Sequence, residues 1–224
     1  LSEKIYRHVV GEKHFDDEIV YIEKDNSFYT SVYRSKSGKF IIISNSSTLV
    51  SDYHLLYADD PYGEFRSFTP RQNGHEYSIA HIENYFFILS NKDALNNRLM
   101  KTSDASTNIS NWEEVIPHDK EVHLLGMEVF NGHLAINERQ DGLLGLRILN
   151  LEKMTEHRVK FEEEDHSVSF SRNFEIQTNI LRFTYNSMKT PIMIVDYNMD
   201  SKEKIIVKQQ KVVGGYNPND YHST

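Results

Sequence analysis

Clusters of carboxylates are the side chains of this 224-residue chain with the most evident potential for chemistry. Asp59-Asp60 and the run Glu162-Glu163-Glu164-Asp165 carry the oxygen ligands that calcium prefers, but neither has the further spaced ligands of a calcium loop. A glycosidase would need two carboxyl groups held about 5–9.5 Å apart. Each cluster lies at an expected turn, as do Asp16-Asp17-Glu18 and residues 119–121. We therefore interpret all of them as solvated loops, with metal binding and glycoside hydrolysis as less favoured alternatives.

Serine hydrolase and zinc chemistry lack their sequence signatures. A nucleophile elbow needs Gly-x-Ser-x-Gly, because a strained turn must lift the serine clear of the sheet, and no serine has glycines at those offsets. Eleven histidines could supply a general base, yet none has an evident nucleophile partner. His-Glu-x-x-His and paired cysteines are absent as well. The sequence therefore predicts no catalytic residue, no metal site and no cofactor site in this chain.

Charge and composition argue against several classes of protein. A net charge of -8 disfavours a nucleic-acid-binding surface and favours attraction of basic ligands. No apolar run approaches the roughly 18 residues that span a bilayer, so we expect no membrane partner. The absence of cysteine weakly favours a reducing compartment, and we expect a cytoplasmic protein. A first residue of Leu1 rather than methionine is consistent with a segment of a longer chain.

Asparagine recurs directly after short apolar runs at a nearly constant interval along the chain. The four residues are Asn45, Asn91, Asn137 and Asn186, and the differences between successive positions are 46, 46 and 49 residues. A period of about 40–50 residues built from short strands is typical of a β-propeller with one repeat per blade. The four asparagines could form a ring of polar ligands, but we favour turn residues that close the strands through their side chains.

The repeats predict an all-β chain, a partial β-propeller of about four four-stranded antiparallel blades with little helix. The second strand of each repeat is almost continuously apolar, as a strand buried on both faces requires. Polar residues accumulate in the outer strands, for example around Ile205-Ile206-Val207. The boundaries that we predict are residues 28–70, 75–118, 122–161 and 167–212 for the blades, 4–11 for the last strand of a preceding blade, and 213–224 for an exit from the sheet.

Five segments of the chain match sequence segments of a known protein family. They are Tyr6-Arg7-His8, Val32-Tyr33-Arg34-Ser35-Lys36-Ser37-Gly38, residues 57–65 (Tyr57 to Phe65), residues 112–118 (Trp112 to His118) and residues 208–221 (Lys208 to Tyr221). In this order and without large gaps, they resemble the propeller domain of oligopeptidase B, or protease II, in the prolyl oligopeptidase family. The last segment is the most specific, because in that family it closes the propeller and leads into the catalytic domain.

The resemblance implies a serine peptidase that cleaves short peptides after Arg or Lys. In that family a seven-bladed propeller caps an α/β-hydrolase domain and restricts entry to small substrates. This sequence stops where the catalytic domain is expected to begin, and the first blades are missing too, so no residue of the Ser/Asp/His triad can be assigned. We therefore expect an inactive propeller fragment, whose partner in the full-length protein is a C-terminal catalytic domain that acts on short basic peptides.

Two features suggest roles within such an enzyme. The run Glu162, Glu163, Glu164 and Asp165 is a candidate acidic loop for steering basic peptides. Gly214 and Gly215 form a candidate hinge, because glycine accepts backbone angles that an opening motion requires. A stand-alone interaction module that self-associates through uncovered blade faces is the main alternative. A propeller hydrolase with its own active site is the third.

Overall fold

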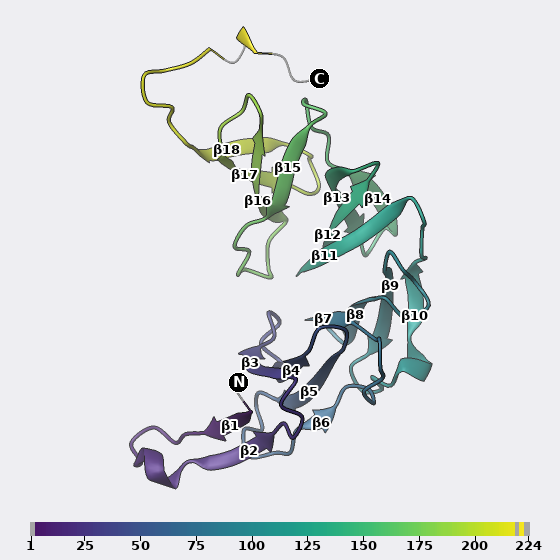
Figure 1. Ribbon diagram of the computed structural model, residues 1–224, viewed down its shortest axis with the longest axis vertical. Coiled ribbons are helices and arrows are strands. Elements are labelled where there is room, and N and C mark those ends of the chain that lie inside the picture. Colours follow the sequence, from purple (N-terminus) through teal and green to yellow (C-terminus); the bar gives the residue numbers. More distant parts are fainter. Residues whose placement is uncertain (1–2, 218–219, 222–224) are drawn as a thin grey trace. The chain divides into compact units, whose positions relative to one another are not determined.

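The computed structural model describes residues 3–217 and 220–221, and nearly all of the regular structure in them is β-strand (Figure 1). The strands form one two-stranded and four four-stranded antiparallel sheets, accompanied by two short 3-10 helices, η1 (His14–Asp16) and η2 (Ile109–Asn111). The prediction of an all-β partial propeller with four-stranded blades is confirmed, and the described residues hold no α/β-hydrolase domain. They also contain no helix of the length and apolarity needed to cross a membrane.

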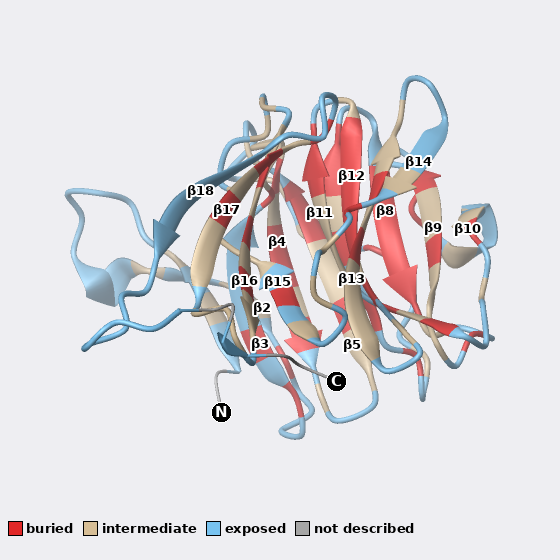
Figure 2. Ribbon diagram, turned by 90° about the horizontal axis from the view of Figure 1, so that it is seen from above, coloured by how far each residue is buried: buried red, intermediate tan, exposed pale blue. Residues whose placement is uncertain are grey.

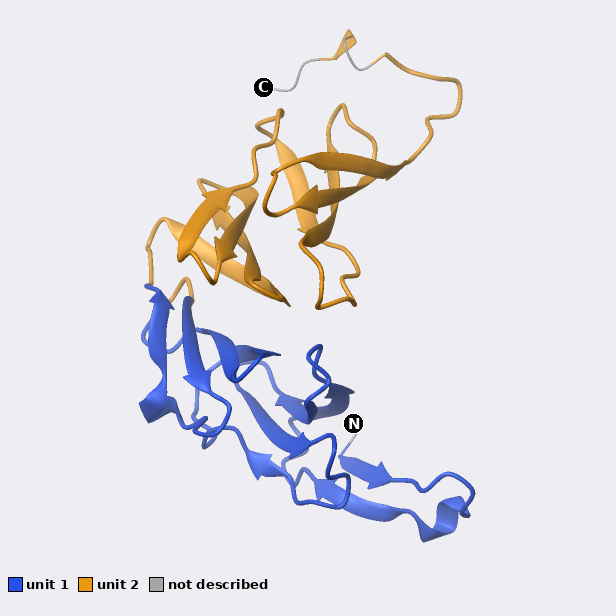
Figure 3. Cartoon of the chain, turned by 180° about the vertical axis from the view of Figure 1, so that it is seen from behind, with its two compact units in different colours: residues 1–94, 98–117 blue, residues 95–97, 118–224 orange. Residues whose placement is uncertain are grey.

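The chain divides into two compact units, shown in separate colours in Figure 3: residues 1–94 with 98–117, and residues 95–97 with 118–224. The first unit holds a hairpin and two sheets in which strands that follow one another in sequence pair. The hairpin and sheets comprise β1 (Lys4–Arg7) and β2 (Glu18–Ile22); β3 (Tyr29–Arg34), β4 (Phe40–Ser46), β5 (Ser51–Tyr57) and β6 (Arg66–Ser67); and β7 (Tyr77–Ile82), β8 (Tyr85–Ser90), β9 (Arg98–Ser103) and β10 (Glu113–Ile116).

The second unit holds the other two sheets, again with sequential strands paired. They comprise β11 (Val122–Phe130), β12 (His133–Gln140), β13 (Leu143–Asn150) and β14 (Thr155–Arg158); and β15 (His166–Phe170), β16 (Ile180–Ser187), β17 (Met193–Asn198) and β18 (Lys204–Gln209). A two-residue turn joins β12 to β13, with φ of +51° at Asp141 and +83° at Gly142. Positive φ at both central residues matches the twist of the flanking strands, which explains the Asp-Gly pair.

The N-terminal hairpin differs from the sequence prediction. The sequence predicts a single strand of a preceding blade at residues 4–11, but β1 pairs with β2, a strand that the sequence analysis does not predict. Arg7 fixes this hairpin, because its guanidinium pairs with Glu18, donates to the carbonyl of Pro61 (2.7 Å) and lies 4.6 Å from the ring centre of Tyr62. This strand carries the apolar run Ile19-Val20-Tyr21-Ile22, which lies before the first predicted blade and is left unassigned by the sequence analysis, and its side chains are exposed or half-buried.

The second strand of each sheet carries most of the core. In β4, β8 and β12 buried residues lie on both faces, as their apolar runs predict, and Figure 2 shows β8 and β12 in red along much of their length. The strand β16 differs, since buried and half-buried positions alternate along it. Only one of its faces packs against the other sheet of its unit, through Leu181, Phe183 and Tyr185.

The recurring asparagines are the second correction. Asn91 follows β8 and makes a turn, where its side chain accepts from the Glu76 amide (2.9 Å). The other three lie inside strands: Asn45 in β4, Asn137 in β12 and Asn186 in β16. The turn interpretation is therefore wrong for these three. Asn91 does lie at a turn, but its backbone carbonyl closes that turn by accepting from the Ala94 amide (3.0 Å). Within β4, the Asn45 amide is satisfied by side chains of two other strands, Tyr21 and Asp52.

Candidate functional site

The acidic loop between β14 and β15 is divided by the structure into an internal and an external part. Glu162, Glu164 and Asp165 are exposed, whereas the side chain of Glu163 turns inward and is 9% exposed. Its carboxylate accepts hydrogen bonds from the Tyr185 hydroxyl (2.8 Å) and from the Thr190 hydroxyl (2.9 Å). Glu163 therefore anchors the loop to β16 and to the turn that follows it, and only its three neighbours present their charge to solvent.

The electrostatics of Glu163 fit this anchoring role. Burial acts to raise the pKa of its carboxyl group, but the hydrogen bonds from Ser187, Tyr185 and Thr190, together with the charge of Lys189, whose ammonium lies 3.6 Å away, outweigh burial. The net pKa of Glu163 is therefore lowered, and the group is ionised in the folded protein. Burial, followed by the hydrogen bond to Glu163 and the charge of that carboxylate, raises the pKa of Tyr185 well above its ordinary value.

A pocket of about 600 Å³ lies beside this anchor and is bounded by the acidic loop and the sheet β15–β18. Its lining combines apolar and charged side chains: Phe161, Phe183, Tyr185, Met193, Val195 and Ile206 on one hand, and Glu162, Glu163, Lys189 and Lys204 on the other, with Thr190. Small-molecule sites combine apolar walls with convergent polar groups, and this lining has both, although its polar share is high. This pocket is therefore the candidate binding site of the second unit.

The candidate hinge also lies in the second unit, after β18. The amide of Gly215 donates to the carbonyl of Val212 (3.1 Å), which closes a turn with Gly214 at its third position. The φ angles are +90° at Gly214 and +77° at Gly215, a region that favours glycine, and an added Cβ would meet no atom within 4 Å at either position. The glycines are thus required by backbone angle and not by space. The predicted exit continues over residues 218–219 and 222–224, which lie outside the described residues.

A hydrogen-bonded series of Ser37, His81 and Asp104 was not predicted. The Ser37 hydroxyl lies 2.7 Å from His81 Nδ1, and His81 Nε2 lies 3.2 Å from Asp104 Oδ2. These are the residue types of a serine hydrolase triad, but the Lys39 ammonium donates to the same Asp104 oxygen (2.5 Å), and the Ser35 hydroxyl bonds to Ser37 (2.9 Å). We interpret the series as a tie between the sheets β3–β6 and β7–β10. Separations of 44 and 23 residues leave no local sequence signal for it.

Burial decides the protonation of this tie. Burial lowers the pKa of His81, and the neighbouring carboxylate of Asp104 only partly offsets it. For Asp104, burial acts to raise the pKa, but hydrogen bonds from Lys39 and His81 outweigh it and lower the net pKa. The result is a neutral histidine beside a carboxylate that Lys39 already neutralises.

A second polar network surrounds Asn45 in the first unit. The Asn45 amide donates to Asp52 Oδ1 (2.8 Å) and to the Tyr21 hydroxyl (2.7 Å). Arg71 pairs with Asp52 and with Glu23 (2.5 Å), and their side chains are only 4% and 6% exposed. Burial acts to raise the pKa of each carboxyl group, but their hydrogen bonds outweigh it and the net pKa of both is lowered. Arg71 bridges the two carboxylates, and Tyr21 and Asn45 donate further hydrogen bonds to Glu23 (3.2 Å) and Asp52 (2.8 Å), so the network is structural in character.

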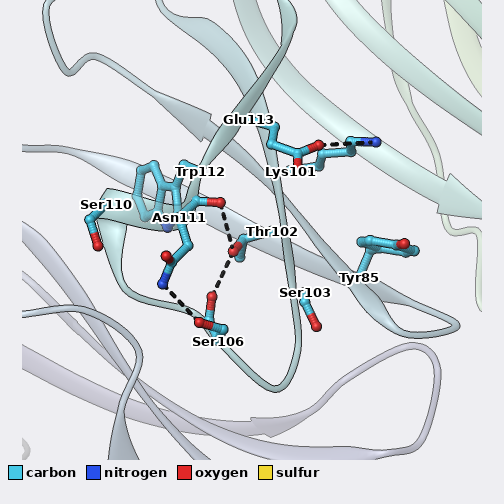
Figure 4. A pocket seen from close by; sticks show the side chains of 9 residues that line it. All are labelled: Tyr85, Lys101, Thr102, Ser103, Ser106, Ser110, Asn111, Trp112 and Glu113. Atoms are coloured by element: carbon cyan, nitrogen blue, oxygen red, sulfur yellow. Dashed lines mark hydrogen bonds and ion pairs between the residues drawn. The ribbon is translucent and has the colours of Figure 1, made fainter.

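A pocket of about 560 Å³ in the first unit is lined mainly by polar side chains of β8, β9, η2 and the segments around η2 (Figure 4). The Thr102 hydroxyl donates to the Ser106 carbonyl (2.8 Å), and the Asn111 amide donates to the Ser106 hydroxyl (2.8 Å). At its rim, Lys101 and Glu113 form an ion pair at 3.4 Å. These groups satisfy one another, so the pocket offers less for a ligand than the pocket beside the acidic loop. Among the described residues, no group of three or more His, Cys, Asp or Glu is arranged to hold a metal ion.

Comparison with known proteins assigns the architecture. A family model described as the prolyl oligopeptidase N-terminal beta-propeller domain matches residues 1–210. The chain belongs to the prolyl oligopeptidase family. It is 34% identical over 222 residues to dipeptidyl aminopeptidase BI of Pseudoxanthomonas mexicana, which covers 99% of this chain and 30% of that protein. It is 27% identical over 220 residues to Protease 2 of Moraxella lacunata, and this match covers 97% of this chain and 31% of that protein.

Solved structures agree with this assignment. The chain superposes on oligopeptidase B from Trypanosoma brucei, a closed form with covalently bound antipain, with a TM-score of 0.88 and 27% identity. The superposition covers 97% of this chain and 32% of that one. The resemblance to the oligopeptidase B propeller is therefore confirmed, and the chain spans about a third of the length of the relatives that it matches.

Replacing Glu163 by glutamine should destabilise the second unit in a pH-dependent way. Because the pKa of Glu163 is lowered by folding, its carboxylate stabilises the fold above its ordinary pKa of 4.5, and this stabilisation is lost as the pH falls through the lowered value. We expect Glu163→Gln to lose about 1–3 kcal/mol of unfolding free energy at pH 7. The gap to the unmodified chain should narrow below about pH 4, measured by urea denaturation at a series of pH values.

The exposed neighbour Glu164 supplies the matched control. Glu164→Gln removes the same charge from the same loop and should change the unfolding free energy by less than about 0.5 kcal/mol. Equal effects of the two substitutions would show that Glu163 is not the anchor.

Proposed function

We propose that this chain is the substrate-filtering propeller of a serine oligopeptidase, one that cleaves short peptides after Arg or Lys. The observation that carries the proposal is the family match over residues 1–210, joined to relatives that are about three times longer and are named as peptidases. The catalytic Ser/Asp/His triad would lie in a C-terminal α/β-hydrolase domain of the full-length protein. The propeller itself would act by restricting which peptides reach that domain.

Two properties of the described residues support a role in handling basic peptides. The chain carries a net charge of -8, and a negative field raises the local concentration and association rate of cationic ligands. Glu162, Glu164 and Asp165 project three carboxylates from one loop into solvent. We propose that these three residues, without the internal Glu163, form the steering loop.

Opening of the parent enzyme is the second element of the proposal. The relative from Trypanosoma brucei is described in a closed form. For this chain we propose that Gly214 and Gly215 form the hinge, since they follow the last strand and both hold φ angles that favour glycine.

A stand-alone module that self-associates is the second candidate function. The observation in its favour is the outer strand β18, which is exposed at all six positions and carries Ile205, Ile206 and Val207 at 66%, 57% and 49% exposure. Unpaired strand edges with apolar side chains readily add a strand from another chain.

The specificity of the full-length protein tests the main proposal. A fluorogenic peptide with Arg at the cleaved position should have a kcat/KM at least about tenfold higher than its glutamine counterpart, because the charged contact is lost. Blocking the amino terminus of the peptide distinguishes an oligopeptidase from an enzyme that releases dipeptides. Equal rates for arginine and glutamine peptides would contradict the proposed specificity.

The isolated 224-residue chain separates the two candidate functions. We expect no hydrolysis of the arginine peptide by this chain, since the proposed triad lies outside it. Light scattering of the same preparation reports its mass: growth of the mass with concentration favours the self-associating module, and a monomer at high concentration contradicts it. Hydrolysis that a point mutation in this chain abolishes would overturn both.

Charge reversal of the steering loop should weaken capture of basic peptides. We expect Glu162→Lys with Glu164→Lys and Asp165→Lys in the full-length enzyme to lower kcat/KM for the arginine peptide about two- to fivefold at low salt. The loss should shrink as salt rises towards about 0.15 M, where the Debye length is about 8 Å. The control, Asp59→Lys with Asp60→Lys and Glu64→Lys, makes the same change of charge in another exposed turn. If both triple variants behave alike, net charge and not this loop governs capture.

Substitution of the hinge glycines should slow opening. In Gly214→Ala with Gly215→Ala the added methyl groups meet no neighbour, but each left-handed backbone angle costs about 1–2 kcal/mol. We expect a several-fold fall in kcat with slower opening in a fluorescence distance assay. The control is Gly11→Ala with Gly74→Ala, which also combines positive φ (+99° and +69°) with open space. Kinetics that stay unchanged in the first variant, or fall equally in the control, would refute the hinge.

A further inference from the structure

The tripeptide Asn-Gly-His occurs in two turns of this chain. One copy is Asn73-Gly74-His75, in the segment between β6 and β7, and the other is Asn131-Gly132-His133, where β11 turns into β12. An asparagine followed by glycine readily loses its side-chain amide, because glycine has no side chain to hinder attack by its backbone nitrogen on the asparagine side chain. The local sequence therefore gives both copies the same intrinsic reactivity.

The first copy lies in an open turn that places little restraint on the reacting atoms. Residues 72–75 form this turn, which is closed by a hydrogen bond of 3.3 Å from the His75 amide to the Gln72 carbonyl. Asn73 and Gly74 are exposed, and among the described residues neither the Asn73 side chain nor the Gly74 amide has a hydrogen-bond partner. A Cβ added at Gly74 would meet no atom within 4 Å, so the space beside the attacking nitrogen is open.

The second copy is held by hydrogen bonds of the asparagine itself. The Asn131 backbone amide donates to the Ile176 carbonyl (2.8 Å), and its side-chain amide donates to Gln177 Oε1 (3.0 Å). The residues on either side, Phe130 and His133, pair with each other in the ladder between β11 and β12. Attack by the Gly132 nitrogen requires the Asn131 side chain to swing over its own backbone, which breaks its contact with Gln177 and distorts the hairpin. The fold therefore protects one of two copies that have the same sequence.

The backbone that follows the reacting atoms of the first copy is well anchored. The Gly74 carbonyl accepts from Asn91 Nδ2 (3.2 Å), and the His75 carbonyl accepts from the Ser51 amide (3.1 Å). The Glu76 amide donates to Asn91 Oδ1 (2.9 Å). These contacts fix the entry to β7 without engaging the Asn73 side chain or the Gly74 nitrogen. Freedom to react is thus confined to a short joint between the sheets β3–β6 and β7–β10.

We propose that Asn73 is a self-modification site, at which the exposed turn converts asparagine to isoaspartate and aspartate while Asn131 stays intact. The site concerns the covalent chemistry of this chain alone and does not depend on the proposed peptidase activity. Its only co-reactant is water. Either product adds a negative charge to the joint between the two sheets, and isoaspartate also adds a carbon atom to the backbone there.

The chemistry proceeds through a cyclic imide and balances with water. The Gly74 nitrogen loses its proton and attacks Asn73 Cγ, so a carbon–nitrogen bond forms and closes the ring. The bond between Cγ and the side-chain nitrogen breaks, and this nitrogen leaves as ammonia with the proton that Gly74 lost. Water then opens the ring at one of its two carbonyl carbons: attack at Cγ gives aspartate, and attack at the backbone carbonyl gives isoaspartate. Direct hydrolysis of the side chain gives aspartate only, so isoaspartate identifies the ring-closing route.

Peptide mapping by mass spectrometry tests the proposal on the 224-residue chain. The folded chain and the chain unfolded in urea are kept in the same mildly alkaline buffer, and conversion at Asn73 and at Asn131 is followed over time, with isoaspartate identified by its backbone fragments. A hydrogen bond that must first be broken slows a reaction by roughly fivefold. We expect similar rates at the two sites in urea, and in the folded chain a rate at Asn73 at least about fivefold above that at Asn131. Equal rates in the folded chain, or aspartate at Asn73 without isoaspartate, would overturn the proposal.

A variant of the protected turn tests why the two copies differ. Gln177 is exposed, so Gln177→Ala should leave the fold intact, which thermal denaturation verifies. Because this variant removes the partner of the Asn131 side chain, we expect conversion at Asn131 to become several-fold faster while the rate at Asn73 stays the same. An unchanged rate at Asn131 would show that hydrogen bonding does not set the selectivity and would refute that part of the proposal.

Discussion

Each four-stranded sheet of this chain has an interior strand with apolar side chains on its faces, and a single sheet cannot remove both faces from water. In the first unit the rings of Phe40, Phe68 and Phe86 meet between the two sheets. The ring centre of Phe86 lies 5.2 Å from that of Phe40 and 5.1 Å from that of Phe68. In the second unit a corresponding cluster joins β11–β14 to β15–β18. A blade is therefore stable only when stacked, and the spacing of the repeats follows from this requirement.

Polar contacts then select one arrangement from the many that apolar packing would tolerate. A buried polar group costs free energy unless it is hydrogen-bonded, so groups that meet across two elements fix their register. His81 performs this task between two sheets, and Glu163 performs it between a connecting loop and the sheet that follows. The chemistry of these residues resembles that of active sites, yet their partners neutralise them. Geometry and compensation of charge therefore distinguish a structural tie from a reactive centre.

The fold could be read from the sequence because burial leaves a local pattern. Runs such as Phe40-Ile41-Ile42-Ile43 indicate interior strands, and four such runs at a regular interval indicate the blades of a propeller. The strand β2 also carries an apolar run, Ile19 to Ile22, but it lies outside the four repeats. Its pairing with β1 is supported by contacts of Arg7, which leave no local pattern in the sequence. The asparagines show the same limit: Asn45 is defined by Tyr21 and Asp52, partners that no rule of local spacing could supply.

The candidate sites depended still more on contacts between distant residues. The sequence marked the acidic loop as a run of four equivalent charges, but Tyr185 and Thr190 make one of them internal. The pocket beside it requires a loop, a turn and three strands to converge, and Lys204 has no signal of its own in the sequence. The hinge glycines were easier to find, because a backbone angle is a property of one residue.

The exposure of β18 along its whole length has a mechanical consequence. A strand with no buried side chain has little to lose beyond its backbone hydrogen bonds when it leaves the sheet, so it occupies the low end of the local stabilities in this unit. Six residues in extended form span about 20 Å. The segment that leads to Gly214 and Gly215 could therefore be lengthened by detaching β18 from the sheet, without disturbing the packed core of this unit.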